Sequence, residues 1–288
     1  MFTQLTKNDP VWGKLPDFQF DAPYYDNDET WKYLADELRR YIAWLETEVC
    51  PGHKFDINTF RPILAKQEYI MELWHEFNRL MMCKPAPYSG WRFGDVAWKC
   101  TQHIPIGQKK TVALFERMVA ETEEKVKNGV GFVPNERIRI YWPDLRPQWS
   151  YKLEDWLAKE YGAVVVCDNQ SIDPYEPIDL STEQTIFEGL AKRWLLSTPM
   201  VRQSHGGPDV QLQDLIYGVK EFQADCVIWP GHRGHKDQSA SANMMRECCR
   251  DLGVPLLHLN TDVFDERITP LDKIKQQISE FFENTGLA

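Results

Sequence analysis

The sequence predicts an α/β protein in which a doubly wound, four-stranded parallel sheet follows a mostly helical N-terminal region. From Glu136 onward, four short apolar and β-prone runs alternate with helical patterns, as in a parallel sheet. Residues 28–128 instead show apolar side chains at the spacing of three and four that amphipathic helices have. Because the hydrophobic period changes near Glu136, we divide the chain into a helical part, 1–130, and a parallel α/β part, 131–288.

Three helices are expected in the first part. Asp28 and Glu29 supply the acidic first turn that a helix N-terminus favours, and Asn128–Gly129 is a typical helix end. The segment 17–21, DFQFD, is expected as a short strand, and 84–90 as a rigid extended turn. The expected helices span about 28–49, 58–82 and 109–127.

The second part alternates strands with helices. Its expected strands are 137–142, 163–166, 226–229 and 256–259, and its helices are about 151–161, 182–195, 209–222, 240–251 and 270–284. If the strand order is 2-1-3-4, the sheet is flavodoxin-like and its topological switch point lies between the first and third strands. The loops that leave these two strands, 142–149 and 230–238, then face each other across one crevice.

Polar and aromatic side chains crowd these two loops. Ligands of open α/β sheets bind outside the carboxyl ends of the strands, and the helix after 238 offers free N–H groups to an anion. We therefore assign substrate binding to Arg146, Trp149, His232 and Lys236, with His235 beside them. The alternative is an ordinary strand-to-helix turn with solvated histidines and lysine.

Metal-ligating and catalytic motifs are sparse. His232 and His235 are three residues apart and offer two nitrogens, whereas a mononuclear site needs three or four ligands. Cys167 and Cys226 lie inside apolar strands, where a structural thiol is the common case. The chain contains no GxGxxG, Walker A, GxSxG or HExxH motif, and the Gly-rich run 204–208 is expected to be a turn.

Composition narrows the class of protein. The net charge of −10 argues against a nucleic-acid interface, which needs a basic face. No apolar run approaches the roughly 20 residues that span a membrane, and no secretory signal is evident at the start. The 7 cysteines are scattered without a CxxC pair, which favours reduced thiols in the cytoplasm.

Several segments together resemble the 2-hydroxyacyl-CoA dehydratase and ATP-dependent benzoyl-CoA reductase subunits. The resembling segments occur in family order over residues 16–284, and the similarity is greatest to a reductase-type subunit of the D-component type. They are KFDINTF, KPAPYSG, RIRIYWPDLRPQWS, AVVVCD, ADCVIWPGHRGHKDQSASANMMREC and LGVPLLHLNTDVFDER.

The resemblance implies a subunit that pairs with a related subunit and acts on an acyl-CoA thioester. It also implies a [4Fe-4S] cluster between domains, supplied with one electron by an ATP-dependent activator. The electron generates a ketyl radical anion of the thioester, which leads either to loss of the 2-hydroxyl group or to reduction of an aromatic ring.

Two departures from the family leave the role of this chain open. The first part resembles only the end of the first family domain, without the Rossmann-like half that carries cluster cysteines. His235 also stands where the family has a cluster cysteine, and imidazole replaces thiolate as a ligand only in some iron–sulfur centres. The chain is therefore expected to be either an enzyme subunit or a cluster-less, non-catalytic paralogue that serves as a binding or scaffold subunit. Association through the helices of 28–128 is expected in both cases.

Overall fold

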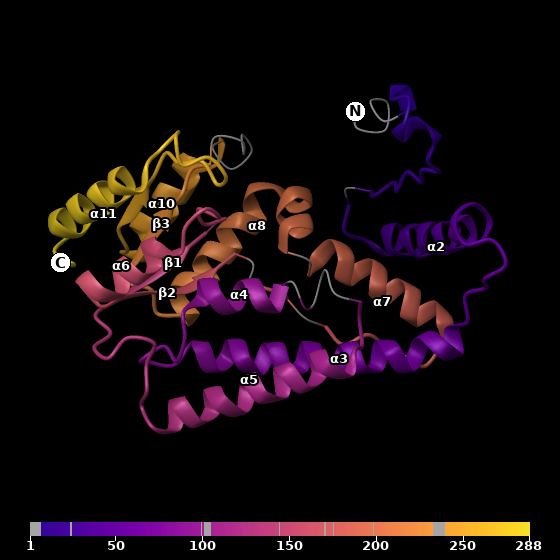
Figure 1. Ribbon diagram of the computed structural model, residues 1–288, viewed down its shortest axis with the longest axis horizontal. Coiled ribbons are helices and arrows are strands. Elements are labelled where there is room, and N and C mark those ends of the chain that lie inside the picture. The colour runs from indigo at the N-terminus through magenta and orange to yellow at the C-terminus, as the bar shows by residue number, and fades with distance from the viewer. Residues whose placement is uncertain are drawn as a thin grey trace.

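The computed structural model describes residues 7–23, 25–98, 100, 105–143, 145–169, 171–174, 176–197, 199–232 and 240–288. Its first part is helical and its second part alternates strands with helices, as the hydrophobic pattern predicts (Figure 1). The elements are η1 (Trp12–Lys14), α2 (Asp28–Trp44), the π-helical turn η2 (Leu45–Val49), α3 (Ile57–Met81), α4 (Gly90–Trp98), α5 (Lys109–Lys127), β1 (Ile138–Trp142), α6 (Lys152–Tyr161), β2 (Ala163–Asp168), α7 (Glu183–Leu196), α8 (Pro199–Glu221), β3 (Cys226–Trp229), α10 (Ala242–Leu252), β4 (Leu256–His258) and α11 (Leu271–Thr285).

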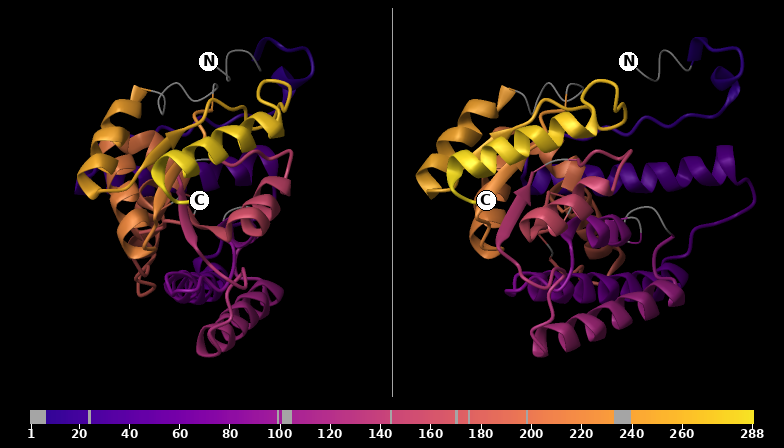
Figure 2. Two further views of the ribbon diagram at one scale, coloured as in Figure 1. Left: turned by 90° about the vertical axis from the view of Figure 1, so that its left-hand side faces the viewer. Right: turned by 60° about the vertical axis from the view of Figure 1, so that its left-hand side comes forward.

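The four strands form one parallel sheet in the order β2-β1-β3-β4, which confirms the expected order. In β1, Ile138 pairs with Ala163 of β2, and Ile140 pairs with Cys226 of β3. The topological switch point therefore lies between β1 and β3, as expected. Helices cover both faces, and α11 lies on the side of the sheet opposite to α8 and α10 (Figure 2).

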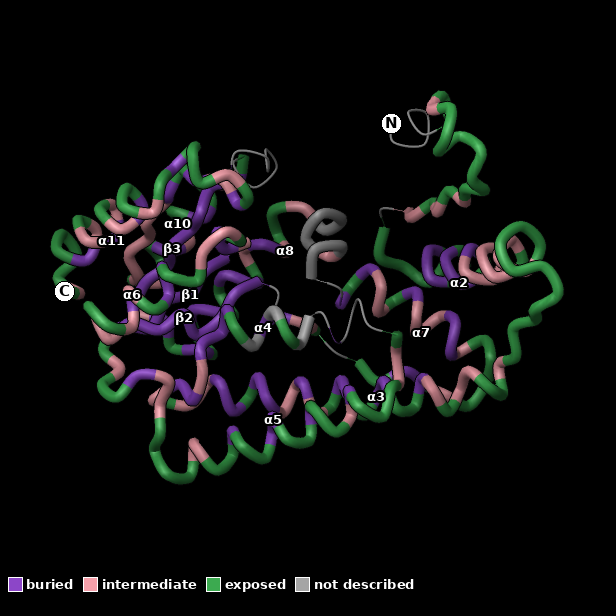
Figure 3. Tube along the Cα trace, viewed as in Figure 1, coloured by how far each residue is buried: buried purple, intermediate pink, exposed green. Residues whose placement is uncertain are grey.

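Side chains alternate between the two faces and fill two separate cores. Ile138, Ile140 and Trp142 pack with α4, α6 and α11, whereas Tyr141 and Val227 pack with α8 and α10. All residues of β1, β2 and β3 are buried, as expected for a parallel sheet covered by helices (Figure 3).

The helical part shares its core with the sheet. Trp74 and Phe77 of α3 and Phe115 of α5 belong to the same hydrophobic cluster as Val164 and Val166 of β2. In Figure 1, α3 and α5 lie side by side below the sheet and run in the same direction. The division of the chain at about residue 130 stays a prediction, because this shared core crosses it.

Two local predictions were wrong. Residues 17–21 form no strand; Phe18 and Phe20 instead pack against the Tyr41 ring of α2, in an edge and a tilted arrangement with ring centroids 5.2 and 5.5 Å apart. The alternation of these side chains produces an extended segment, but this segment has no partner strand. The second error is α4, which was not expected and begins at the end of the predicted turn. A Cβ atom on its first residue, Gly90, would lie 3.0 Å from the backbone of β2, so the tight helix–strand contact requires glycine.

The helix after α7 is also longer than predicted. It begins at Pro199, and at Gly207 the backbone leaves helical geometry with φ 67° and ψ −163°. The Gly-rich run is therefore a kink inside α8, and the C-terminal arm of this helix corresponds to the expected helix of 209–222.

Most tryptophans of the helical part point inward. Trp31, Trp74 and Trp91 are buried, whereas Trp12 on the N-terminal arm is 61% exposed. The exposed apolar surface of this part thus includes the arm, residues 7–23, which runs apart from the sheet in Figure 1. Association through this surface stays a prediction.

A buried arginine joins β1 to two helix ends. The Arg139 side chain is fully buried, and its Nε donates to the carbonyl oxygen of Phe222, just after α8, at 2.8 Å. Its two Nη atoms donate to the carbonyl oxygens of Cys83 and Met82, just after α3, at 3.2 and 3.3 Å. Nη1 also pairs with Glu136 Oε1 at 2.6 Å. The guanidinium group thereby satisfies carbonyl groups that helix termini leave open.

Removal of this arginine should strongly destabilise the fold. We expect Arg139→Met to lower the free energy of unfolding by about 3–5 kcal/mol, because Glu136 would remain as a buried charge without its partner. Urea unfolding followed by tryptophan fluorescence would measure the change. Arg137→Met is the matched control, since Arg137 lies two residues away and is exposed. A loss of less than about 1 kcal/mol in Arg139→Met, or an equal loss in the control, would contradict the assigned role.

Candidate functional site

The structure brings two of the predicted site residues together through the loop that follows β4. Trp149, after β1, donates from Nε1 to the carbonyl oxygen of Asp262 at 3.2 Å. His232, after β3, accepts the backbone N–H of Val263 at Nδ1, with a distance of 3.3 Å. The loops after β1, β3 and β4 therefore meet at the carboxyl edge of the sheet, where sequence analysis placed a crevice.

The side chain of His232 is held in place by this contact. It is 8% exposed, and Nδ1 is occupied as an acceptor, so a neutral ring carries its proton on Nε2. Asp262 Oδ2 lies 3.6 Å from Nδ1, which is longer than a hydrogen bond. Asp262 instead accepts the backbone N–H groups of Phe264 and Asp265, and these bonds hold the pKa of its carboxyl below the ordinary range.

A close backbone approach fixes the start of the β3 loop. Gly231 has a positive φ of 54°, and a Cβ atom at this position would lie 2.1 Å from the carbonyl oxygen of Leu259. Only glycine fits such a conformation so near another backbone. This contact sets the path by which the loop reaches His232.

Arg146 is oriented by α6 and not by the β3 loop. Its Nη2 donates to the Tyr151 hydroxyl at 2.8 Å, and its guanidinium carbon lies 4.2 Å from the centre of that ring. Arg146 also helps to offset the burial that raises the pKa of Glu154. Arg146 is 3% exposed, so its first role is to pack the β1 loop onto α6. The other two predicted residues, His235 and Lys236, lie outside the described residues.

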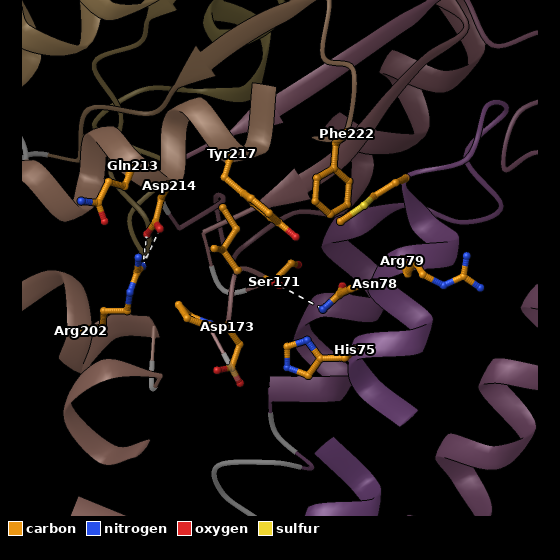
Figure 4. A pocket seen from close by; sticks show the side chains of 13 residues that line it. His75, Asn78, Arg79, Ser171, Asp173, Arg202, Gln213, Asp214, Tyr217 and Phe222 are labelled. Carbon is orange, nitrogen blue, oxygen red and sulfur yellow. Dashed lines mark hydrogen bonds and ion pairs between the residues drawn. The ribbon is translucent and has the colours of Figure 1, made fainter. Parts of the chain in front are cut away.

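A larger cavity lies beside this edge, between α3, the loop after β2, and α8. We call it the α3–α8 cavity; its volume is about 550 Å³, within the range of small-molecule sites. Figure 4 shows side chains from all three segments converging on it. Its lining residues are His75, Asn78, Arg79, Met82, Ser171, Ile172, Asp173, Pro174, Arg202, Gln213, Asp214, Tyr217 and Phe222.

One residue of the α3–α8 cavity also lies close to the switch point of the sheet. Asp214 lines the cavity and also lines a smaller void with Tyr141 and Trp229, which lie near the carboxyl ends of β1 and β3. Ser171 and Asp173 follow β2 and form part of the cavity wall. One part of the cavity wall therefore lies at the edge of the sheet at which α/β proteins bind their ligands.

Ion pairing and hydrogen bonding position the polar wall. Arg202 Nη1 lies 2.5 and 2.6 Å from the two carboxylate oxygens of Asp214, across the kink of α8. On the opposite wall, Asn78 of α3 donates to the carbonyl oxygen of Ser171 at 3.1 Å. These bonds tie α8 to itself and α3 to the β2 loop, and so hold the cavity open between them.

Among the residues that line the cavity, Asp173 and His75 have large pKa shifts. Burial raises the pKa of Asp173 to about 6, although Arg193, Ser197 and Arg202 act in the opposite direction. Burial, together with the charge of Arg193, lowers the pKa of His75 to about 4. At neutral pH the cavity thus holds an uncharged imidazole and a carboxylate that a small environmental change would protonate.

The described residues do not fit an iron–sulfur cluster. Cluster ligands are thiolates gathered at one place, whereas Cys167 and Cys226 belong to opposite faces of the sheet and to non-adjacent strands. Burial raises the pKa of both thiols well above the ordinary value, which keeps them protonated. Within the part of the chain that the structure describes, no three His, Cys, Asp or Glu side chains are grouped to hold a metal. None of the described helices is long and apolar enough to cross a membrane.

Sequence reasoning missed the α3–α8 cavity. One signal was present, because Asp168, Ser171 and Asp173 follow a buried strand as closely as the chosen loops do. The remaining wall residues had no local signal, since they lie on helices whose facing surfaces depend on packing. The Arg202–Asp214 pair further depends on a kink that the sequence marks only by its glycines.

Comparison with known proteins identifies a family for this chain. The profile of the family described as 2-hydroxyglutaryl-CoA dehydratase, D-component, matches residues 4–285. No curated protein matches the chain significantly.

The buried carboxyl of Asp173 should make stability depend on pH. Its raised pKa means that the folded state holds this proton more tightly than the unfolded state, so the associated stability is present below pH 3.8 and is lost as pH rises through 6. Asp173→Asn carries no such loss, and we expect it to be about 1–3 kcal/mol more stable than the wild type at pH 7.5 and nearly equal at pH 4. His75 titrates in both proteins, so its contribution cancels in the difference.

Urea unfolding at both pH values would measure this difference. Asp209→Asn is the control, because Asp209 is exposed on α8 and should change stability by less than about 0.5 kcal/mol. An Asp173→Asn protein that is equally stable or less stable than the wild type at pH 7.5 would show that this carboxylate is well compensated.

Proposed function

This chain belongs to the 2-hydroxyglutaryl-CoA dehydratase D-component family, and on that premise we propose that it is a subunit of a 2-hydroxyacyl-CoA dehydratase type enzyme. The observation that carries the proposal beyond family membership is the α3–α8 cavity at the carboxyl edge of the sheet. In this proposal the cavity receives the acyl part of an acyl-CoA thioester. The family favours dehydration over the ring reduction that the resemblance also allowed.

The walls of the cavity suit an acyl group that carries one polar reaction centre. Phe222, Met82 and Ile172 supply apolar surface, while His75 and Asp173 supply polar groups opposite one another (Figure 4). Ligand pockets commonly combine a mostly apolar lining with a few placed polar groups. In this proposal the nucleotide part of coenzyme A lies outside the cavity, toward the solvent.

The part that we assign to this chain is substrate binding. The described cysteines do not fit the [4Fe-4S] cluster that the resemblance implies, so we derive no redox step from this chain. A related subunit, supplied by an ATP-dependent activator, would provide that chemistry. This distribution of roles also motivates the alternative of a non-catalytic binding subunit. Such a subunit would still bind acyl-CoA, but the assembled complex would turn over its substrate without this chain.

Blocking the cavity should abolish acyl-CoA binding. Gln213 is an exposed residue of α8 at the edge of the cavity, and we expect Gln213→Trp to weaken binding of 2-hydroxyhexanoyl-CoA at least tenfold, about 1.4 kcal/mol. Isothermal titration calorimetry on the purified chain is the measurement. Ile216→Trp is the matched control, because Ile216 is an exposed position on the same helix and does not line the cavity.

Two results would count against the proposal. If the wild-type chain shows no heat of binding at millimolar thioester, the cavity is not an acyl-CoA site. If Gln213→Trp and Ile216→Trp bind equally well, the thioester binds elsewhere on the chain. To separate the enzyme subunit from the non-catalytic alternative, turnover of the complex would be compared with and without this chain.

A further inference from the structure

Each arginine near the α3–α8 cavity is already paired with a carboxylate. Arg202 lies against Asp214, and the two side chains are only 11% and 3% exposed. Arg193, which is near the cavity but does not line it, makes a bidentate contact with Glu68, in which the Nη2–Oε2 distance is 2.7 Å. Both arginines are thus held by carboxylates in largely buried pairs, although their charges still favour the ionised form of Asp173.

The third arginine, at the rim, offers little to a bound anion. Arg79 is 65% exposed, and its Nε donates to Glu76 at 2.8 Å. Its positive charge is therefore both paired and screened by solvent. The described lining of the cavity contains no lysine.

The unbalanced charge of the cavity is negative. Asp173 faces the cavity from the β2 loop and makes no salt bridge among the described residues, although Arg193, Arg202 and a hydrogen bond with Ser197 favour its ionised form. His75, on the facing helix, is uncharged at neutral pH because burial lowers its pKa to about 4. A second carboxylate brought into this space by a ligand would meet a like charge at low dielectric, and every cation among the described lining residues is already held in an ion pair.

The opposite part of the wall is apolar. Ile172 and Phe222 are almost fully buried and line the cavity together with Met82. The ring of Tyr217 extends along this wall in Figure 4. An apolar acyl chain would gain from burial against these groups, whereas an ionised terminus would lose its hydration there without a partner.

From this charge distribution we propose that the acyl group bound by the α3–α8 cavity carries no carboxylate of its own. The substrate class is then a monocarboxylic 2-hydroxyacyl-CoA with an apolar chain, in contrast to the 2-hydroxyglutaryl thioester for which the family is named. This inference rests on the proposed function, and it specifies which thioesters the same site accepts.

The test compares thioesters of similar size on the full-length wild-type chain. Dissociation constants at pH 7.5 would be measured by calorimetry for 2-hydroxyhexanoyl-CoA, 2-hydroxyglutaryl-CoA, and the terminal amide of the latter. We expect the hexanoyl thioester to bind at least tenfold more tightly than the glutaryl thioester. The amide, which has the shape of the glutaryl group without its charge, should fall between them.

A variant identifies the cause of the discrimination. Asp173→Asn removes the unbalanced carboxylate and should reduce the ratio of the two dissociation constants at least threefold, whereas the exposed Asp209→Asn should leave this ratio unchanged. Thermal unfolding of each variant would confirm that it is folded before binding is compared. The wild-type comparison itself needs no variant.

The outcomes separate this inference from the proposed function. If none of the three thioesters binds, the proposed function fails and the inference falls with it. If 2-hydroxyglutaryl-CoA binds as tightly as the hexanoyl thioester or more tightly, the proposed function stands and the charge-based inference is overturned. A ratio that persists unchanged in Asp173→Asn would overturn the assignment of the discrimination to this carboxylate.

Discussion

The buried guanidinium group of Arg139 is the constraint on which the positions of the other elements depend. One side chain holds the first strand of the sheet to the ends of α3 and α8, the two helices that form the walls of the cavity. A buried charged group is tolerated only when neighbouring groups supply its hydrogen bonds and its counter-charge. Glu136 supplies the counter-charge and in turn accepts the backbone N–H of Ala86 at 2.5 Å, which anchors the turn before α4.

The cavity follows from this arrangement because its two helices diverge from a common anchor. Met82 and Phe222 lie next to Arg139 at one end, and the same two residues line the cavity. Farther from the anchor, the β2 loop fills the space between the helices only in part. The contacts of Arg139, which stabilise the fold, and the α3–α8 cavity are therefore built from adjacent residues. A substitution in one is expected to alter the other.

The sequence predicted the helices and strands well because the spacing of apolar residues is a local property of the chain. The burial of parallel strands makes their apolar pattern especially strong. The sequence placed the switch point correctly, and it placed Trp149 and His232 at the sheet edge. It could not predict which side chains face each other across helices far apart in the chain. Arg139 illustrates the limit: in the run RIRIYW its alternation with isoleucine suggests an exposed face, yet α3 and α8 cover it completely.

The kink at Gly207 links this fold to the chemistry of the cavity. A straight helix would place Arg202 and Asp214 three turns apart along its axis, about 18 Å. The kink instead folds the first arm of α8 back so that the two side chains meet, which neutralises an arginine at the place where an anionic ligand would need one. The kink of α8 thus pairs the positive charge of Arg202 with Asp214. Asp173 then determines the sign of the remaining formal charge of the cavity. In the proposed function this geometry favours an uncharged acyl chain, and Asp173 is the residue to which we assign the discrimination against anions.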